Sequence, residues 1–213
     1  MAATERRAVG TPFYRFARGL LAAFSALFYP CKIVNQRAAD LNAPLILICN
    51  HQSMMDPVLL AVKLPQHEIH FIGKREITKF KPLKWVVERL HMIAISRHMS
   101  DLAAMRAAGA ALKGNHVLGI FPEGKRCDGP SMDIVESGAS LLAQRHKVPL
   151  LPVYIAGRPR PFRRVIMEVA PPLQYEDLLG EGIDKAATER INQRIRQLYQ
   201  DFDIKYNKKT IGA

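Results

Sequence analysis

Short apolar runs alternate with helix-like segments from about residue 40 onward, and this alternation restricts the possible folds more than any other feature. Apolar runs bounded by Pro, Gly or polar residues are typical of strands that are buried on both faces of a sheet. The segments between them have the apolar periodicity of helices, which can cross over from one parallel strand to the next. The sequence therefore predicts an α/β domain with a mostly parallel central sheet flanked by helices.

The apolar runs and the periodic segments define the expected elements. We expect strands at residues 45–49, 69–72, 92–95, 117–121, 150–155 and 165–169. We expect helices at residues 56–62, 83–90, 101–114, 137–146 and 185–208. The last helix has an apolar face that would pack on the domain, formed by Ile191, Ile195, Leu198 and Phe202.

A separate helix is expected near the N-terminus, ending before Pro30. Thr11 can cap this helix, and Pro12 suits its first turn. Its apolar face recurs at steps of three and four residues: Phe13, Phe16, Leu20, Phe24 and Leu27. The flanking Arg15 and Arg18 favour a helix that lies in a membrane interface. Packing against the domain's own core is the alternative explanation of the same face.

No segment near the N-terminus has the length of a membrane span. The uncharged stretch at residues 19–31 holds 13 residues, whereas a spanning helix needs roughly 20. The residues before Pro30 also make a poor cleavage site for a secretory signal. The three cysteines are an odd number without metal-ligand spacing, which favours a reducing environment. We expect a peripheral or monotopic protein on the cytoplasmic face of a membrane.

The chain is strongly basic, with 31 Lys and Arg against 19 acids and a formal net charge of +12. Such an excess favours an anionic partner, such as nucleic acid, an anionic membrane surface or a phosphorylated substrate. The basic clusters lack interleaved aromatic residues and no nucleic-acid motif is present, which argues against nucleic acid. Two clusters stand out: Lys74, Arg75, Lys79, Lys81 and Lys84, and Arg158, Arg160, Arg163 and Arg164.

A histidine and an aspartate follow the first predicted strand of the domain. In α/β sheets, ligands bind at the loops that leave the carboxyl ends of the strands. Asp56 could hold one ring nitrogen of His51 and leave the other nitrogen free to take a proton. An exposed histidine beside a helix-capping aspartate is the alternative. Ser53 is too close to His51 for attack and lacks a G-x-S-x-G elbow, so we interpret it as a loop or cap hydroxyl.

A second polar segment follows the strand predicted at residues 117–121. Gly124 would let the backbone turn and approach a ligand. Lys125 and Arg126 would place two cations beside His51 if the two strands are neighbours. Glu123 could accept a hydrogen bond from a substrate hydroxyl. A solvated charged turn is the alternative, and Cys127 has no motif that would make it a nucleophile.

Taken together, these segments resemble the glycerolipid acyltransferases of the lysophosphatidic acid acyltransferase (PlsC-like) family. The family motif N-H-x-S-x-x-D is present at Asn50 to Asp56, and F-P-E-G-T-R-S is similar to Phe121 to Cys127. The second block ends in an arginine after a strand, as at Ile95 to Arg97, and the V-P-x-x-P-V block is present at Val148 to Val153. The stretch from Gly73 to Glu76 looks like the family's lysine-containing block. All blocks occur in the family's order.

The resemblance implies a mechanism and a set of site residues. His51 would be the general base and Asp56 would orient it, without an acyl-enzyme, a metal or a cofactor. A substrate-binding group would hold the acceptor phosphate and glycerol: Arg97, Glu123, Gly124, Lys125 and Arg126. The acyl donor would be a thioester of coenzyme A or of acyl carrier protein. The chain departs from the family pattern at Lys125, where Thr is usual, at Cys127, where Ser is usual, and at Ser96, where Asp is common.

On this basis we expect a membrane-associating helical segment at residues 1–38 and an acyltransferase domain at residues 39–213. The implied reaction is acylation of the sn-2 hydroxyl of 1-acylglycerol 3-phosphate to give phosphatidic acid for phospholipid biosynthesis. Acylation of glycerol 3-phosphate or of another lyso-lipid is an alternative. A catalytically inactive protein that binds lipid at the membrane surface is an alternative of a different class.

Overall fold

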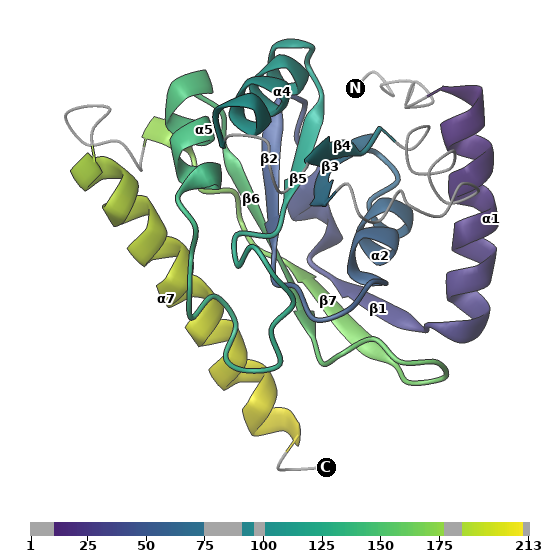
Figure 1. Ribbon diagram of the computed structural model, residues 1–213. Helices are drawn as coiled ribbons and strands as arrows, with labels where there is room; N and C mark the ends of the chain where they lie inside the picture. Colours follow the sequence, from purple (N-terminus) through teal and green to yellow (C-terminus); the bar gives the residue numbers. More distant parts are fainter. Residues whose placement is uncertain (1–10, 75–90, 96–100, 177–184, 211–213) are drawn as a thin grey trace, which may run out of the picture.

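The computed structural model describes residues 11–74, 91–95, 101–176 and 185–210. Within them, seven strands form one sheet in the order β1-β7-β6-β2-β5-β3-β4 (Figure 1). Their bounds are β1 Cys31–Val34, β2 Leu45–Cys49, β3 Ile69–Lys74, β4 Ile93–Ile95, β5 Val117–Ile120, β6 Leu150–Ala156 and β7 Val165–Val169.

The sheet is mostly parallel, as predicted. Strand β2 lies at its centre and pairs in parallel with β5 on one side and β6 on the other. The pairs β3–β5, β3–β4 and β1–β7 are also parallel. Only β6–β7 is antiparallel among these pairings, because the short connection at residues 157–164 turns the chain back without a crossover helix.

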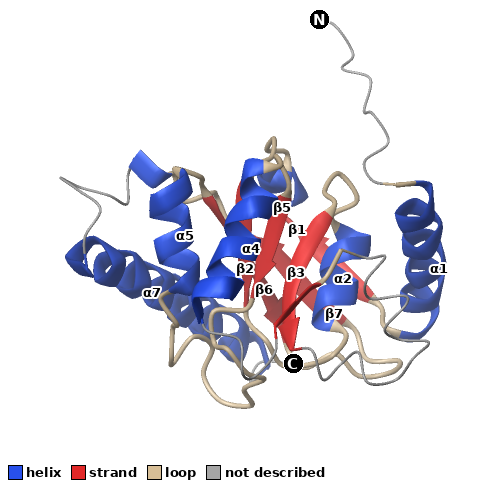
Figure 2. Ribbon diagram, turned by 45° about the horizontal axis from the view of Figure 1, so that its top comes forward, coloured by secondary structure: helices blue, strands red, loops and turns tan. Residues whose placement is uncertain are grey.

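Helices cover both faces of the sheet. Figures 1 and 2 show α4, α5 and α7 on one side and α1 and α2 on the other. The bounds are α1 Pro12–Phe28, α2 Asp56–Lys63, α4 Asp101–Lys113, α5 Gly138–His146 and α7 Lys185–Thr210, with a short 3-10 helix at Gln36–Ala39. Each side has its own core. Ile46 and Ile48 of β2 face the α4, α5 and α7 side, whereas Leu45 and Leu47 face α2.

Strand β2 shows why the apolar runs were informative. All five of its residues are buried, because successive side chains point to opposite faces and both faces are covered by helices. The predicted strands at residues 45–49 and 165–169 have the observed bounds, and the other described elements differ by a few residues at their ends. The helix predicted at residues 83–90 lies outside the described residues.

Strand β1 was not predicted from the sequence. It is an edge strand with β7 as its neighbour, and its side chains are exposed or half-buried. A half-covered edge does not need a continuous apolar run, so the sequence carried no strong signal. Residues 31–34, which we had assigned to the N-terminal segment, are therefore part of the sheet.

Helix α1 forms as predicted. Thr11 caps it by accepting a hydrogen bond from the Tyr14 N–H at 3.2 Å, and Pro12 occupies its first turn. The helix packs on α2, with Tyr14 and Ser25 buried. Four residues of the predicted apolar face are exposed instead of packed on the core: Phe16, Leu20, Phe24 and Leu27. In the described part of the chain, no helix is both long enough and apolar enough to cross a membrane.

Candidate active site

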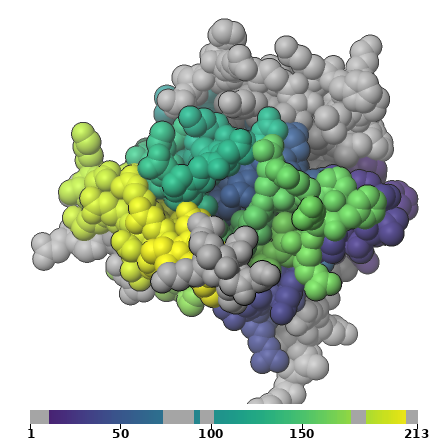
Figure 3. Space-filling model, turned by 90° about the horizontal axis from the view of Figure 1, so that it is seen from below, coloured from purple at the N-terminus to yellow at the C-terminus, as the bar shows by residue number. Residues whose placement is uncertain are grey.

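The two predicted polar segments meet at one edge of the sheet. Strands β2 and β5 are parallel neighbours, so the loops that leave their carboxyl ends lie side by side. The Cys127 N–H donates a hydrogen bond of 2.8 Å to the carbonyl of His51, which ties the two loops directly. In Figure 3 the blue surface after β2 lies between the teal surface after β5 and the green connection from β6 to β7.

His51 and Asp56 form the predicted pair. His51 Nδ1 lies 2.9 Å from Asp56 Oδ2. The imidazole is partly exposed, at 18%, whereas the carboxylate is fully buried. Because Asp56 accepts from Nδ1–H, the imidazole is held in the tautomer that leaves Nε2 able to take a proton. The ring also stacks on Phe121, with ring centroids 4.2 Å apart, which holds the ring plane.

The same carboxylate oxygen organises the loop around the histidine. Asp56 Oδ2 also accepts hydrogen bonds from the backbone N–H groups of Gln52 and Ser53, at 2.7 and 2.6 Å. These two N–H groups are therefore engaged by Asp56 and do not point to a substrate oxyanion. Ser53 Oγ accepts from the Met55 N–H at 3.2 Å, which is the predicted role of a loop hydroxyl.

Glu123 is turned into the protein. Its side chain is 4% exposed. Its Oε2 accepts from the His51 N–H at 2.7 Å, and its Oε1 accepts from the Met132 N–H at 2.9 Å. Burial raises the pKa of Glu123, and these two hydrogen bonds oppose the rise. Both carboxylate oxygens thus hold backbone around the site, whereas we had predicted a contact between Glu123 and a substrate hydroxyl.

Asp203 of α7 extends this framework and was missed by sequence analysis. Its Oδ2 accepts from the Ser131 N–H at 2.7 Å, and its Oδ1 accepts from the Ser131 and Tyr154 hydroxyls at 2.9 and 2.6 Å. Ser131 is adjacent to Met132, which Glu123 holds. Helix α7 therefore fixes the loop after β5 through Asp203. Nothing local in the sequence pairs residues 72 positions apart.

Asn50 is a second positioning residue that sequence analysis left unused. Its side chain is buried and pairs with the backbone of Ile155 in β6. Nδ2 donates to the Ile155 carbonyl at 3.0 Å, and the Ile155 N–H donates to Oδ1 at 2.8 Å. The residue before His51 is thus locked to the neighbouring strand. Its place in the N-H-x-S-x-x-D motif was the signal that could have identified it.

The turn after β5 carries the predicted cations. Gly124 has φ of +66°, which favours glycine, and an added Cβ there would collide with the Glu136 carboxylate. Lys125 and Arg126 are both exposed, on the loop that contacts His51. Arg97, the remaining member of the predicted phosphate-binding group, lies outside the described residues.

Cys127 is not suited to act as a nucleophile. Burial raises the pKa of its thiol, and the nearby Glu123 adds to the rise. The reactive form of cysteine is the thiolate, which a raised pKa disfavours at neutral pH. The structure thus agrees with the sequence, in which no motif supported this role.

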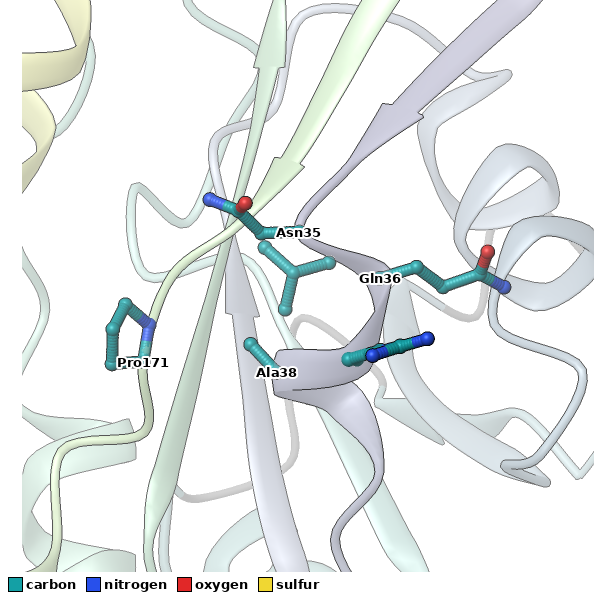
Figure 4. A pocket seen from close by; sticks show the side chains of 6 residues that line it. Asn35, Gln36, Ala38 and Pro171 are labelled. Atoms are coloured by element: carbon teal, nitrogen blue, oxygen red, sulfur yellow. The ribbon is translucent and has the colours of Figure 1, made fainter.

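One shallow depression lies away from these residues. It has a volume of about 520 Å³ and is lined by Asn35, Gln36, Arg37, Ala38, Val169 and Pro171 (Figure 4). The lining residues lie beside β1 and β7, at one side edge of the sheet. None of them belongs to the His51 loop or to the turn at Gly124, so the depression contributes nothing to the candidate chemistry.

Sequence comparison identifies the family of the chain. The sequence model of the family described as Acyltransferase matches residues 31–156. The chain belongs to the acyltransferase family. The matched region begins at β1 and ends with β6, so it contains the His51–Asp56 pair and the turn at Gly124.

Two bacterial relatives match over most of this acyltransferase. The 1-acyl-sn-glycerol-3-phosphate acyltransferase of Bacillus subtilis (strain 168) is 25% identical over 199 residues, which cover 89% of this chain and 98% of the relative. The protein of the same name from Streptococcus pneumoniae is 26% identical over 212 residues, which cover 89% of this chain and 76% of the relative.

A solved structure has the same fold. The crystal structure of the 1-acyl-sn-glycerophosphate (LPA) acyltransferase PlsC from Thermotoga maritima matches with a TM-score of 0.70 and 22% sequence identity. The match covers 88% of this chain and 78% of the other. At this identity the likeness establishes the architecture of this acyltransferase, and the mostly parallel sheet flanked by helices is confirmed.

Proposed function

We propose that this acyltransferase moves a fatty acyl group from a thioester to the sn-2 hydroxyl of 1-acylglycerol 3-phosphate, which gives phosphatidic acid. The observation that carries the proposal is the His51–Asp56 pair, at 2.9 Å, on a loop joined to the turn that presents Lys125 and Arg126. A base beside two exposed cations suits an acceptor that has both a hydroxyl and a phosphate. The names of the two bacterial relatives support the same acceptor.

The proposed reaction is a direct transfer. His51 Nε2 takes the proton of the acceptor hydroxyl as its oxygen attacks the thioester carbonyl, which becomes tetrahedral. Collapse of this intermediate breaks the carbon–sulfur bond, and the departing thiolate takes the proton from the imidazolium. Asp56 keeps the ring oriented and stabilises its charged form. No acyl-enzyme is formed, and the donor is acyl-CoA or acyl carrier protein.

We assign Glu123 as a positioning residue rather than as a substrate ligand. It accepts hydrogen bonds from the N–H groups of His51 and Met132, and these bonds fix the backbone of the histidine loop relative to the loop after β5. Lys125 and Arg126 contact the phosphate, together with Arg97. Arg126 suits a forked contact with two phosphate oxygens, whereas Lys125 supplies a point charge. Gly124 supplies the turn that brings these two side chains to the mouth of the site.

The acyltransferase reaches its lipid acceptor through an apolar surface beside the sheet. Phe16, Leu20 and Leu27 of α1 are 65%, 59% and 68% exposed. Phe162 in the β6–β7 connection is 72% exposed. Its N–H donates to the Phe28 carbonyl at 2.6 Å, and its ring packs edge-on against the Phe28 ring at 5.6 Å. Figure 3 shows this green connection beside the purple α1.

Positive charge borders this apolar surface at Phe162. Arg160, Arg163 and Arg164 flank Phe162 and are exposed. Apolar side chains next to exposed arginines suit the interface of an anionic membrane. Arg18 is not part of this surface, because it donates to the Pro65 carbonyl at 2.7 Å. Arg158 is not free either, since it pairs with Asp128 at 2.8 Å.

The decisive experiment compares the wild type with His51→Ala on radiolabelled lysophosphatidic acid and an acyl thioester. Loss of a general base typically lowers the rate by about 10² to 10⁴-fold, so we expect phosphatidic acid from the wild type and almost none from the variant. His146→Ala is the matched control, because His146 lies on α5, away from the site. It should keep the wild-type rate.

The outcomes separate the alternative functions. Turnover of glycerol 3-phosphate or of another lyso-lipid in preference to lysophosphatidic acid would replace the acceptor but retain the reaction. Absence of product with every acceptor and with both donor classes, while vesicle binding persists, would indicate the inactive lipid-binding protein. Full activity of His51→Ala would refute the assignment of the base.

A further inference from the structure

A second group of histidines lies at the opposite edge of the sheet from His51. His70 is near the start of β3, His91 lies two residues before β4, and His116 directly precedes β5. Because these three strands are parallel neighbours, the residues before their starts share one edge. Glu68, just before β3, joins them. Neither the family motifs nor the proposed mechanism uses any of these side chains.

The ligand atoms of three of these side chains converge. Suitable atoms of Glu68, His70 and His91 all lie within 4.8 Å of one another. His91 Nε2 is 2.7 Å from Glu68 Oε1, which is the distance of an ion pair if the imidazole is protonated, although the geometry is not that of a hydrogen bond. A cation bound between the two atoms would replace this contact.

His70 supplies an unpartnered nitrogen at the centre of the group. The residue is 9% exposed, and its Nε2 is buried without a hydrogen-bond partner in the described part of the chain. Buried polar groups in proteins nearly always have a partner, so one without a partner needs an explanation. An imidazole binds a metal ion through an unprotonated ring nitrogen, and a bound ion would supply the partner that Nε2 lacks.

Neighbouring rings hold these histidines in place. The His70 ring lies between those of His91 and His116, with centroid separations of 4.8 and 4.3 Å. The Tyr14 ring of α1 approaches His91 at 6.1 Å. The side chains are thus prepositioned by packing, which reduces the entropy that a metal site must overcome.

We propose that Glu68, His70 and His91 bind one Zn²⁺ ion, with water in the fourth position. Two imidazoles and one carboxylate are a preferred donor set for zinc, with bonds of about 2.0 to 2.2 Å. Tetrahedral ligands at that distance lie roughly 3.3 Å from one another. Small side-chain rotations would open the Glu68–His91 separation from 2.7 Å and close the longer separations, which reach at most 4.8 Å. His116 stays as the ring that stacks on His70.

The bound ion takes no part in the proposed acyl transfer. It lies beyond the starts of β3 and β5, whereas His51 and Phe121 lie beyond the ends of β2 and β5, so the length of a strand separates it from the acyl-transfer site. Glu68 and His70 lie at the start of β3 and His91 lies in the turn before β4, so the ion ties these two segments together. A ligand that binds only the folded chain stabilises it by mass action.

The test measures zinc binding to the tag-free, full-length chain after treatment with EDTA. Titration against a fluorescent zinc indicator should give one Zn²⁺ per chain, and added Zn²⁺ should raise the thermal midpoint. His70→Phe keeps an aromatic ring in the stack and removes the nitrogen, so we expect at least a thirtyfold weaker affinity and no thermal shift. Glu68→Gln, at a partly exposed position, should weaken the affinity at least tenfold.

Controls distinguish this site from other metal-binding groups. His146→Ala should bind zinc as the wild type does, because His146 lies outside the group. His51→Ala should also bind normally, so failure of the proposed acyl transfer and failure of the zinc site are separable. A wild type that binds less than one tenth of an ion per chain would overturn the proposal. Unchanged affinity in both His70→Phe and Glu68→Gln would overturn it too.

Discussion

At the scale of single residues, Asp56 Oδ2 connects most of the site. It accepts from one side chain and two backbone N–H groups, while Asp56 Oδ1 is buried without a partner among the described residues. The three hydrogen bonds therefore converge on the oxygen that faces His51, and they fix both the imidazole and the loop that carries it.

Asp56→Asn tests this role. The amide keeps the size of the side chain and one acceptor oxygen, but it removes the charge that stabilises the imidazolium. We expect the acylation rate to fall by about 10² to 10⁴-fold, while circular dichroism remains that of the wild type. Steady-state kinetics over a range of acceptor concentrations checks the result. A kcat equal to that of the wild type would show that the charge of Asp56 is not needed.

For Cys127→Ala, in contrast to Asp56→Asn, we expect no loss of activity. Because burial and Glu123 raise the pKa of the thiol, Cys127 is protonated at neutral pH and takes no part in the transfer. We expect the variant to retain the wild-type kcat within about twofold, since its loss touches no transition-state interaction. Loss of activity together with a trapped acyl-enzyme in the wild type would establish covalent catalysis instead.

At the scale of elements, α7 stabilises the loop after β5, which in turn holds the site. Asp203 holds Ser131, Glu123 holds the adjacent Met132, and the same carboxylate of Glu123 holds His51. Glu168 of β7 anchors the helix farther along, because it accepts from Lys205 Nζ and the Tyr206 hydroxyl. The long C-terminal helix thus positions a loop to which it contributes no catalytic group.

Asp203→Ala tests whether the contacts of α7 stabilise the loop after β5. It leaves the Ser131 N–H and the Ser131 and Tyr154 hydroxyls without their acceptor, which costs about 1 to 3 kcal/mol of the free energy of unfolding. Urea denaturation measures the loss. Asp201→Ala is the matched control, because Asp201 is exposed on the same helix. Equal stability of the two variants would contradict the proposed role of Asp203 in holding the loop after β5.

The exposed face of α1 makes a second prediction at this scale. We expect Phe16→Ser combined with Leu20→Ser to weaken binding to anionic vesicles by at least tenfold, because burial of a large apolar side chain is worth about 1.5 to 3 kcal/mol. Vesicle sedimentation measures the partition. Leu102→Ser on α4 is the control, since Leu102 is 53% exposed but lies away from α1. An equal effect of the control would rule out a specific role for α1.

At the scale of the whole molecule, the proposed binding to a membrane rests on both charge and apolar surface. The chain carries a formal net charge of +12. Exposed arginines border the apolar surface formed by α1 and Phe162. Electrostatic attraction acts over a Debye length, whereas apolar insertion requires contact. The positive charge of the acyltransferase would thus attract it to an anionic membrane, and the exposed apolar side chains would then insert and keep it bound.

Salt separates these two contributions. Raising NaCl from 0.1 to 1 M shortens the Debye length from about 10 to about 3 Å. We expect the partition onto anionic vesicles to fall at least tenfold over this range, while weak binding to neutral phosphatidylcholine vesicles stays unchanged or rises. Sedimentation at each salt concentration checks this. Binding to anionic vesicles that does not respond to salt would assign the interaction to the apolar surface alone.

The sequence by itself determined the α/β class, most strand positions and the histidine–aspartate pair. These features are local: the run at Leu45–Cys49 must be buried on both faces, and His51 and Asp56 are joined by one short loop. The Thr11 cap and the turn at Gly124 were equally readable, because a capping hydroxyl and a positive φ are properties of single residues.

Only the tertiary structure decided how distant residues are used. The sequence suggested Glu123 as a substrate ligand, but burial directs its carboxylate to the backbone of His51 and Met132. Asp203 acts on a residue 72 positions away, and His70 meets His91 because β3 and β4 are neighbours. Such contacts depend on strand order and helix packing, which local periodicity does not encode.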